Sequence, residues 1–164
     1  MPPPSDPSKD TTRAFLEQAI RLAVDNVAAG GGPFGAIVVR RGEVIARGAN
    51  RVTAEADPTA HAEVVAIREA CRVLGTFQLD GCDVYSSAEP CPMCMGALYW
   101  ARPDRVFFAS DRAAAAAAGF DDRFIYDELA RTVDARDLDT RHVEVEGAGR
   151  EFDAWASNPD RTEY

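Results

Sequence analysis

The chain has 164 residues, of which 46% are hydrophobic, and this suits one globular domain with its own core. Asp and Glu outnumber Lys and Arg by 27 to 18, and the net charge of −9 argues against a protein that grips a nucleic-acid backbone. No apolar run approaches the roughly 20 residues of a membrane span, which argues against a membrane protein.

Residues 1–10 are rich in Pro and polar side chains, and they lack the apolar centre of a signal peptide. We therefore predict a disordered tail over 1–10, a single domain over 11–164, and a cytoplasmic location. In that reducing compartment, closely spaced Cys residues indicate metal binding or catalysis more often than a disulfide.

The first predicted helix runs from Thr11 or Thr12, either of which can cap it, to about Ala29. Its apolar face carries Phe15, Ala19, Leu22, Ala23 and Val27. Two β-rich runs, at 35–40 and 43–49, flank Arg41-Gly42 and predict a hairpin. We expect a loop over 51–58.

A second helix is predicted from about residue 60 to 74, with Thr59 as its cap. Further along the chain, strands are predicted at 82–86, 105–109 and 142–146, and helical segments at 92–101, 113–118 and 152–156. Residues 120–122 are predicted to lead into another short helix, which ends at about Ala130. Segment 131–139 is expected to be a loop. Strands that alternate with helices favour a single α/β sandwich.

Two short motifs carry the chemistry, and each lies at the predicted start of a helix. The first is His61-Ala62-Glu63, and the second is Glu89-Pro90-Cys91-Pro92-Met93-Cys94. Cys91 and Cys94 are three residues apart, so their sulfur atoms face one side of the helix, where its N-terminus stabilises thiolates. Taken alone, each motif is commonplace, and a lone Cys-x-x-Cys also fits half a structural zinc site or a redox pair.

The number of available ligands favours a catalytic zinc ion. A structural site needs a fourth ligand, and the remaining candidates form no second close pair: Cys71, Cys82 and His142. By default, we expect Cys71 and Cys82 to be buried small side chains. His61, Cys91 and Cys94 then leave one coordination position open, as catalytic zinc sites do.

Glu63 is predicted to be the acid/base. It projects away from His61 on an ideal helix, so the two are not expected to share an ion, and Glu63 can instead reach a water on the metal. Zinc lowers the pKa of such a water to about 7, and a positioned carboxylate that moves protons is worth roughly 10²–10⁴-fold in rate. The two motifs together are the signature of zinc-dependent nucleobase deaminases. The alternative to an enzyme is a protein scaffold in which zinc stabilises the fold without catalysis.

The resemblance to a known family extends beyond these motifs. With them, segments 32–36, 57–63, 99–103, 118–126 and 163–164 make nearly the whole chain after the first ten residues resemble the cytidine deaminase superfamily, and within it the bacterial guanine deaminases. The resemblance implies a three-layer α/β/α sandwich with a mixed central sheet and one Zn²⁺ per subunit. It also implies hydrolysis of guanine to xanthine and ammonia in purine catabolism or salvage.

The resemblance also implies roles for residues that bind substrate. Asn50 would hydrogen-bond the base, and the backbone around Ala62 would line the pocket. Phe34 would stack on the purine with Trp100 nearby, and Asp122 would accept protons from the guanine edge. From the residues alone, packing remains open for Phe34 and Trp100, and helix capping for Asp122.

Tyr164 is implied to close the site. Because the C-terminal segment is exchanged between two subunits in such guanine deaminases, Tyr164 would serve the partner of a homodimer. The sequence departs from the family at Ala88, where a Cys is usual, and at 113–118 and 131–149, so the pocket lid, dimer surface and substrate range could differ. Guanosine, another aminopurine or a triazine amine are alternative substrates. A tRNA adenosine deaminase is disfavoured by the acidic balance and by the Gly-Phe-Asp-Asp stretch at 119–122.

Overall fold

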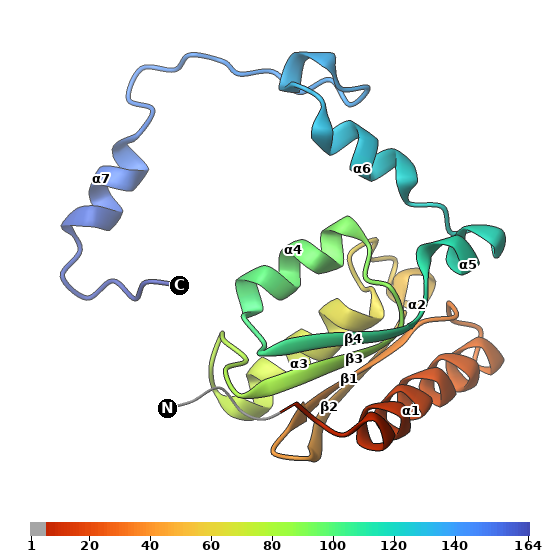
Figure 1. Cartoon of the computed structure of the whole chain (residues 1–164). Coiled ribbons are helices and arrows are strands. Elements are labelled where there is room, and N and C mark those ends of the chain that lie inside the picture. Colours follow the sequence, from red (N-terminus) through yellow and green to blue (C-terminus); the bar gives the residue numbers. More distant parts are fainter. Residues whose placement is uncertain (1–5) are drawn as a thin grey trace. The chain divides into compact units, whose positions relative to one another are not determined.

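The computed structural model describes residues 6–164, so the first half of the predicted tail lies outside the described residues. The chain divides into two compact units, Met1–Asp122 and Arg123–Tyr164 (Figure 1). Helix α1 (Lys9–Ala28) begins earlier than predicted, because Ser8 is its N-cap and the Ser8 hydroxyl accepts the backbone N–H of Thr11. Among residues 6–164, none of the helices combines the length and the apolar character that a membrane span requires.

A mixed four-stranded sheet forms the centre of the first unit. Its strands are β1 (Gly35–Arg40), β2 (Glu43–Ala49), β3 (Cys82–Ala88) and β4 (Arg105–Ser110). They lie in the order β2-β1-β3-β4, with β1 antiparallel to both neighbours and β4 parallel to β3. The predicted hairpin and the mixed central sheet are therefore confirmed.

Helices cover both faces of this sheet (Figure 1). On one face, α3 (Ala62–Leu74) and α4 (Pro92–Ala101) bury a cluster that includes Val38 and Val84. On the other face, α1 packs on Ile37, Tyr85 and their neighbours. Side chains alternate between the two faces of each strand, so one short sheet supports both cores and the predicted three-layer sandwich is confirmed.

A glycine in β2 sets the close approach of α3 to the sheet. A Cβ atom on Gly48 would lie 2.1 Å from the carbonyl oxygen of Ala62 and 2.5 Å from the backbone nitrogen of Ala66. No side chain fits there, so Gly48 lets the first turn of α3 rest directly on the strand. This contact fixes the end of α3 that carries His61 and Glu63.

Two local predictions before α3 were wrong. The expected loop over 51–58 contains a short helix, α2 (Val52–Glu55). The N-cap of α3 is His61 and not Thr59, whose backbone N–H and hydroxyl both donate to the carboxylate of Asp57. Thr59 is thus engaged in an Asx turn and is not available to cap the helix.

The remaining helices mostly follow the prediction. Helix α5 (Arg112–Ala117) ends the first unit, whereas α6 (Arg123–Ala130) and α7 (Arg150–Ser157) belong to the second. The expected loop at 131–139 holds a single 3₁₀ turn, Val133–Ala135. The predicted strand at 142–146 was wrong, because no strand within residues 6–164 pairs with this segment, and alternation alone supplies no hydrogen-bonding partner.

Candidate zinc and substrate site

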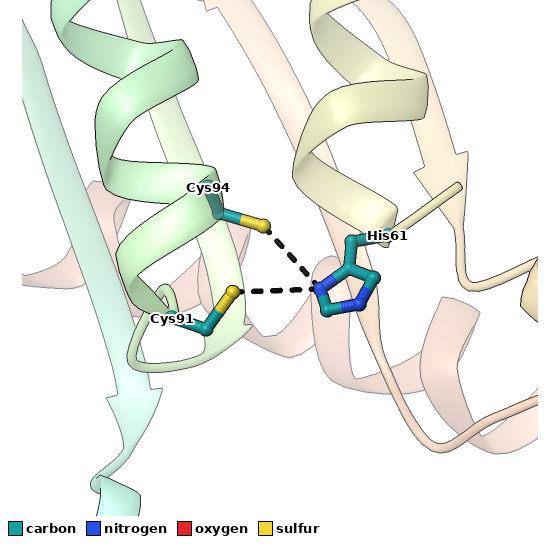
Figure 2. Close-up of side chains that lie close together, drawn as sticks. All are labelled: His61, Cys91 and Cys94. Carbon is teal, nitrogen blue, oxygen red and sulfur yellow. Dashed lines mark hydrogen bonds between the residues drawn. The ribbon is translucent and has the colours of Figure 1, made fainter. Parts of the chain in front are cut away.

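The starts of α3 and α4 bring the two sequence motifs together. His61 is the N-cap of α3 and Cys91 is the N-cap of α4, both with extended backbones, and Pro92 suits the first position of α4. Because both helices pack on the same face of the sheet, their first turns lie side by side (Figure 2). The His61 Nδ1 atom lies 3.5 Å from the Sγ atom of Cys91 and 3.5 Å from that of Cys94.

These three side chains fit a zinc ion. Their ligand atoms all lie within 4.8 Å of one another. In a tetrahedral zinc site, with bonds of about 2.3 Å to sulfur and about 2.0 Å to nitrogen, the nitrogen atom lies about 3.5 Å from each sulfur atom. The measured separations match this value, and one nitrogen and two sulfurs are ligands that zinc prefers. The predicted ligand set therefore converges, and three ligands leave one position for water or substrate.

The pKa values of His61, Cys91 and Cys94 are shifted in different directions. The hydrogen bond from Cys94, helped by His61, lowers the pKa of Cys91 to about 4 even though burial opposes the charge. The pKa of Cys94 is raised, first because its thiol donates to Cys91 and then because of burial and the nearby Glu63 carboxylate. The hydrogen bond to Cys91 also raises the pKa of His61. One thiolate is thus ready at neutral pH, while the Cys94 proton must leave when a metal binds.

Glu63 faces this cluster from the first turn of α3. Its side chain is buried, with the Oε2 atom 3.4 Å from the Cys94 sulfur. Its Oε1 atom accepts a hydrogen bond of 2.9 Å from the hydroxyl of Ser86. The carboxylate therefore lies beside the metal ligands without being one of the three, as a group that moves protons must.

The sequence did not indicate Ser86 as a residue of the site. This residue is 1% exposed in β3, between a core of Val and Tyr side chains and the second motif. A buried hydroxyl needs a partner, so a Ser at an inward position of an apolar strand was the available signal. Its partner, Glu63, lies on another element, and spacing along the chain could not identify it.

Three of the predicted substrate residues are held by packing and hydrogen bonds within the first unit. Asn50 is buried where β2 ends, its backbone N–H donates to the carbonyl of Phe34, and its side-chain oxygen accepts the N–H of Val52. Ala62 is fully buried at the start of α3. The Phe34 ring meets that of Phe120 edge to face, with centroids 4.9 Å apart.

Asp122 is half-buried at the end of the first unit, and its carboxyl pKa is shifted. Its pKa is raised, first by burial and then by the negative charge of Cys91. Asp122 is not one of the three metal ligands.

Trp100 and Tyr164 lie on two different parts of the chain. Trp100 lies in the last turn of α4 and is 65% exposed. It follows Cys91 by nine residues and Cys94 by six, so the helical rise puts it about 13 Å along the axis from Cys91 and about 9 Å from Cys94. Tyr164 belongs to the second unit, where its ring lies 6.1 Å from that of Trp155. The roles of both residues stay predictions.

Comparison with known proteins agrees with this geometry. Residues 9–110 match the cytidine and deoxycytidylate deaminase zinc-binding region, and the chain belongs to this family of zinc-dependent deaminases. Within the family it is 52% identical to the guanine deaminase of Bacillus subtilis (strain 168), over 151 residues that make up 92% of this chain and 97% of that protein. The X-ray structure of guanine deaminase from Bacillus subtilis superposes with a TM-score of 0.91 at 51% identity, covering 93% of this chain and 98% of that one.

Another branch of the family matches a shorter stretch. The tRNA-specific adenosine deaminase of Aquifex aeolicus (strain VF5) is 47% identical over 96 residues, which is 58% of this chain and 64% of that protein. The match to guanine deaminase must continue beyond Ser110, since 151 residues exceed the length of the family region and everything before it. The additional similarity therefore lies in the segment that contains Asp122 and the second unit.

Proposed function

We propose that the protein hydrolyses guanine to xanthine and ammonia in the cytoplasm. The observation that carries this proposal is the 52% identity to a guanine deaminase over 92% of the chain, which extends past the zinc-binding region. The match to a tRNA-specific adenosine deaminase covers only 96 residues, or 58% of this chain, and therefore gives weaker support for tRNA as the substrate. The net charge of −9 also disfavours an RNA substrate.

The chain supplies the metal ligands and the groups that handle protons. His61, Cys91 and Cys94 would hold zinc, which would supply a Lewis acid and would lower the pKa of a bound water to about 7. Glu63 takes the proton of the attacking water and returns protons to a ring nitrogen of guanine and to the departing amine. Ser86 holds one oxygen of that carboxylate, which fixes the other beside the Cys94 sulfur.

Other side chains recognise the base. The Asn50 amide hydrogen-bonds guanine, the backbone at Ala62 lines the pocket, and the Phe34 ring stacks on the purine, with Asp122 accepting protons from the guanine edge. Asn50 and Phe34 are already coupled by a backbone hydrogen bond of 3.1 Å. A base that leaves any of these buried polar groups unpaired is disfavoured strongly.

The working form is a homodimer that exchanges its C-terminal segments, so that Tyr164 closes the partner's site and Trp100 lies near it. Two observations support this arrangement. Helices α6 and α7 bury no side chain within their own unit. Among residues 6–164, no strand pairs with the outer edge of β4, and Val143 and Val145 alternate along a segment that has the pattern of a strand but no partner there.

The test is ammonia release by zinc-loaded protein, with guanine, guanosine, adenine, cytosine, cytidine and a tRNA anticodon stem-loop as substrates. We expect rapid release from guanine alone. A preference for guanosine would overturn the closed pocket but keep the chemistry. Release from the stem-loop would favour tRNA deamination, and silence on every substrate with zinc bound would favour a non-catalytic scaffold.

A further inference from the structure

Asn26, in the last turn of α1, joins two segments that carry substrate residues. Its side-chain Nδ2 donates one hydrogen bond of 2.8 Å to the carbonyl of Gly32 and another of 2.8 Å to the carbonyl of Asn50. Gly32 precedes Phe34, and Asn50 follows β2. Both protons of the amide are therefore used, and each fixes the backbone beside a residue proposed to contact guanine.

Two glycines make this arrangement possible. A Cβ atom on Gly31 would lie 2.4 Å from the Asn26 Nδ2 atom, and one on Gly32 would lie 2.9 Å from the side-chain carbonyl of Asn50. The loop thus passes between two amide side chains with no room for a methyl group on either residue. Any displacement of this loop moves the Asn50 amide as well.

Termination of α1 does not require the Asn26 side chain. The backbone N–H of Ala29 donates to the carbonyls of Asp25 and Asn26, and that of Gly30 donates to Val27. The backbone N–H of Gly31 also donates to the carbonyl of Asn26, at 2.8 Å. Because the backbone already satisfies these terminal carbonyls, the amide side chain is left for the contacts with Gly32 and Asn50.

We propose that Asn26 is a positioning residue for substrate recognition, which holds the Asn50 amide and the Phe34 ring in the orientation that binds the base. This inference rests on the proposed function, since it assumes that Asn50 and Phe34 contact guanine. Asn50 and Phe34 are joined by one backbone hydrogen bond, and Asn26 fixes the same two segments from α1. Selective recognition depends on such fixed geometry, because small misplacements of polar groups lose the hydrogen bonds they make.

The test replaces Asn26 with its near-isostere in Asn26→Asp. A carboxylate offers no N–H to the two carbonyl oxygens and repels them. We expect the KM for guanine to rise about tenfold, while kcat changes by less than about threefold and zinc content is unchanged. Gly31→Ala should act in the same direction, because its methyl group displaces the Asn26 amide. Asp25→Ala, at the adjacent position of α1, is the matched control and should match the wild type.

Two further readouts separate positioning from folding. Titration of guanine into zinc-loaded Glu63→Gln, with and without Asn26→Asp, should show the same tenfold weakening of binding without turnover. An Asn26→Asp enzyme with a lower Tm but unchanged KM and guanine affinity would overturn the inference while leaving the proposed function intact. If Asn26→Asp does not fold, Gly31→Ala decides by the same criterion. A wild-type enzyme that is inactive on guanine would overturn both proposals.

Discussion

The two units of the chain differ in how they bury apolar side chains. The unit Met1–Asp122 packs helices on both faces of a sheet and contains every side chain of the zinc cluster. In Arg123–Tyr164, neither α6 nor α7 buries a residue, and several large apolar side chains stay exposed: Phe124, Leu129, Phe152 and Trp155. Short helices gain most of their stability from an apolar face that is covered, and α6 and α7 leave large apolar side chains exposed. The zinc cluster thus belongs wholly to the packed first unit, whereas the second unit keeps large apolar side chains exposed.

The largest effect is expected when a metal ligand of the first unit is replaced. Cys91→Ser replaces a thiolate with a pKa of about 4 by a hydroxyl that stays protonated. We expect zinc content to fall from about one per subunit to near zero and guanine turnover to fall below detection. Metal analysis and ammonia release measure the two losses.

Cys71→Ser is the matched control, because it makes the same chemical change outside the zinc cluster. It should retain zinc and turnover. A Cys91→Ser protein that kept full zinc occupancy would contradict the ligand set.

The next effect separates proton transfer from metal binding within the same unit. Glu63→Gln keeps the shape of the side chain but cannot take a proton from water. We expect kcat to fall about 10³–10⁴-fold with zinc content unchanged. Glu69→Gln makes the same change on the exposed side of α3, where Glu69 pairs with Arg72, and should be neutral. Near-normal turnover by Glu63→Gln would mean that another group moves the protons.

The third effect tests the second unit. Tyr164→Ala should reduce kcat/KM for guanine about 10²-fold through loss of closure, whereas Tyr164→Phe should lose less because it keeps the ring. Zinc content should not change in either variant, since no ligand comes from this unit. Steady-state kinetics on guanine provide the measurement.

A mixing experiment decides whether Tyr164 acts within its own subunit. Glu63→Gln lacks the acid/base but keeps an intact Tyr164. Tyr164→Ala keeps Glu63 but lacks the Tyr164 side chain. If the segments are exchanged, a mixed dimer pairs a functional site with an intact Tyr164, so remixing the variants should recover a fraction of wild-type activity. If Tyr164 closes its own site, mixing restores nothing and the exchange is wrong.

The sequence predicted most of the first unit, because its signals are local. The bounds of β1 and β2 follow from two β-rich runs around a Gly turn. The ligand set follows from Cys spacing and from the small number of alternative ligands. The cap of α3 was wrong because Thr59 has a closer partner in Asp57, and this competition is invisible to a pattern that scores one position at a time.

Contacts between distant segments could not be predicted. The bonds of Asn26 to Asn50 and of Ser86 to Glu63 join residues on different elements, and only the folded chain brings them together. The predicted strand at 142–146 failed for the opposite reason. Its alternation is real, but a strand exists only when another strand accepts its hydrogen bonds, and this segment is unpaired in the structure.

The smallest expected effect comes from the hydrogen bond that orients the Glu63 carboxylate. Ser86→Ala removes the 2.9 Å hydrogen bond to Glu63, so the carboxylate loses its preferred orientation. We expect kcat to fall about tenfold with KM and zinc content unchanged, together with a loss of about 1–3 kcal/mol in the free energy of unfolding. Ser86→Thr keeps a hydroxyl and should restore most of the rate. Ser87→Ala is the control: the Ser87 hydroxyl accepts from the backbone of Gly35, so this variant should lose stability without the tenfold loss of kcat. If Ser86→Ala loses stability but keeps its kcat, Ser86 serves the core and Glu63 is positioned by α3 alone.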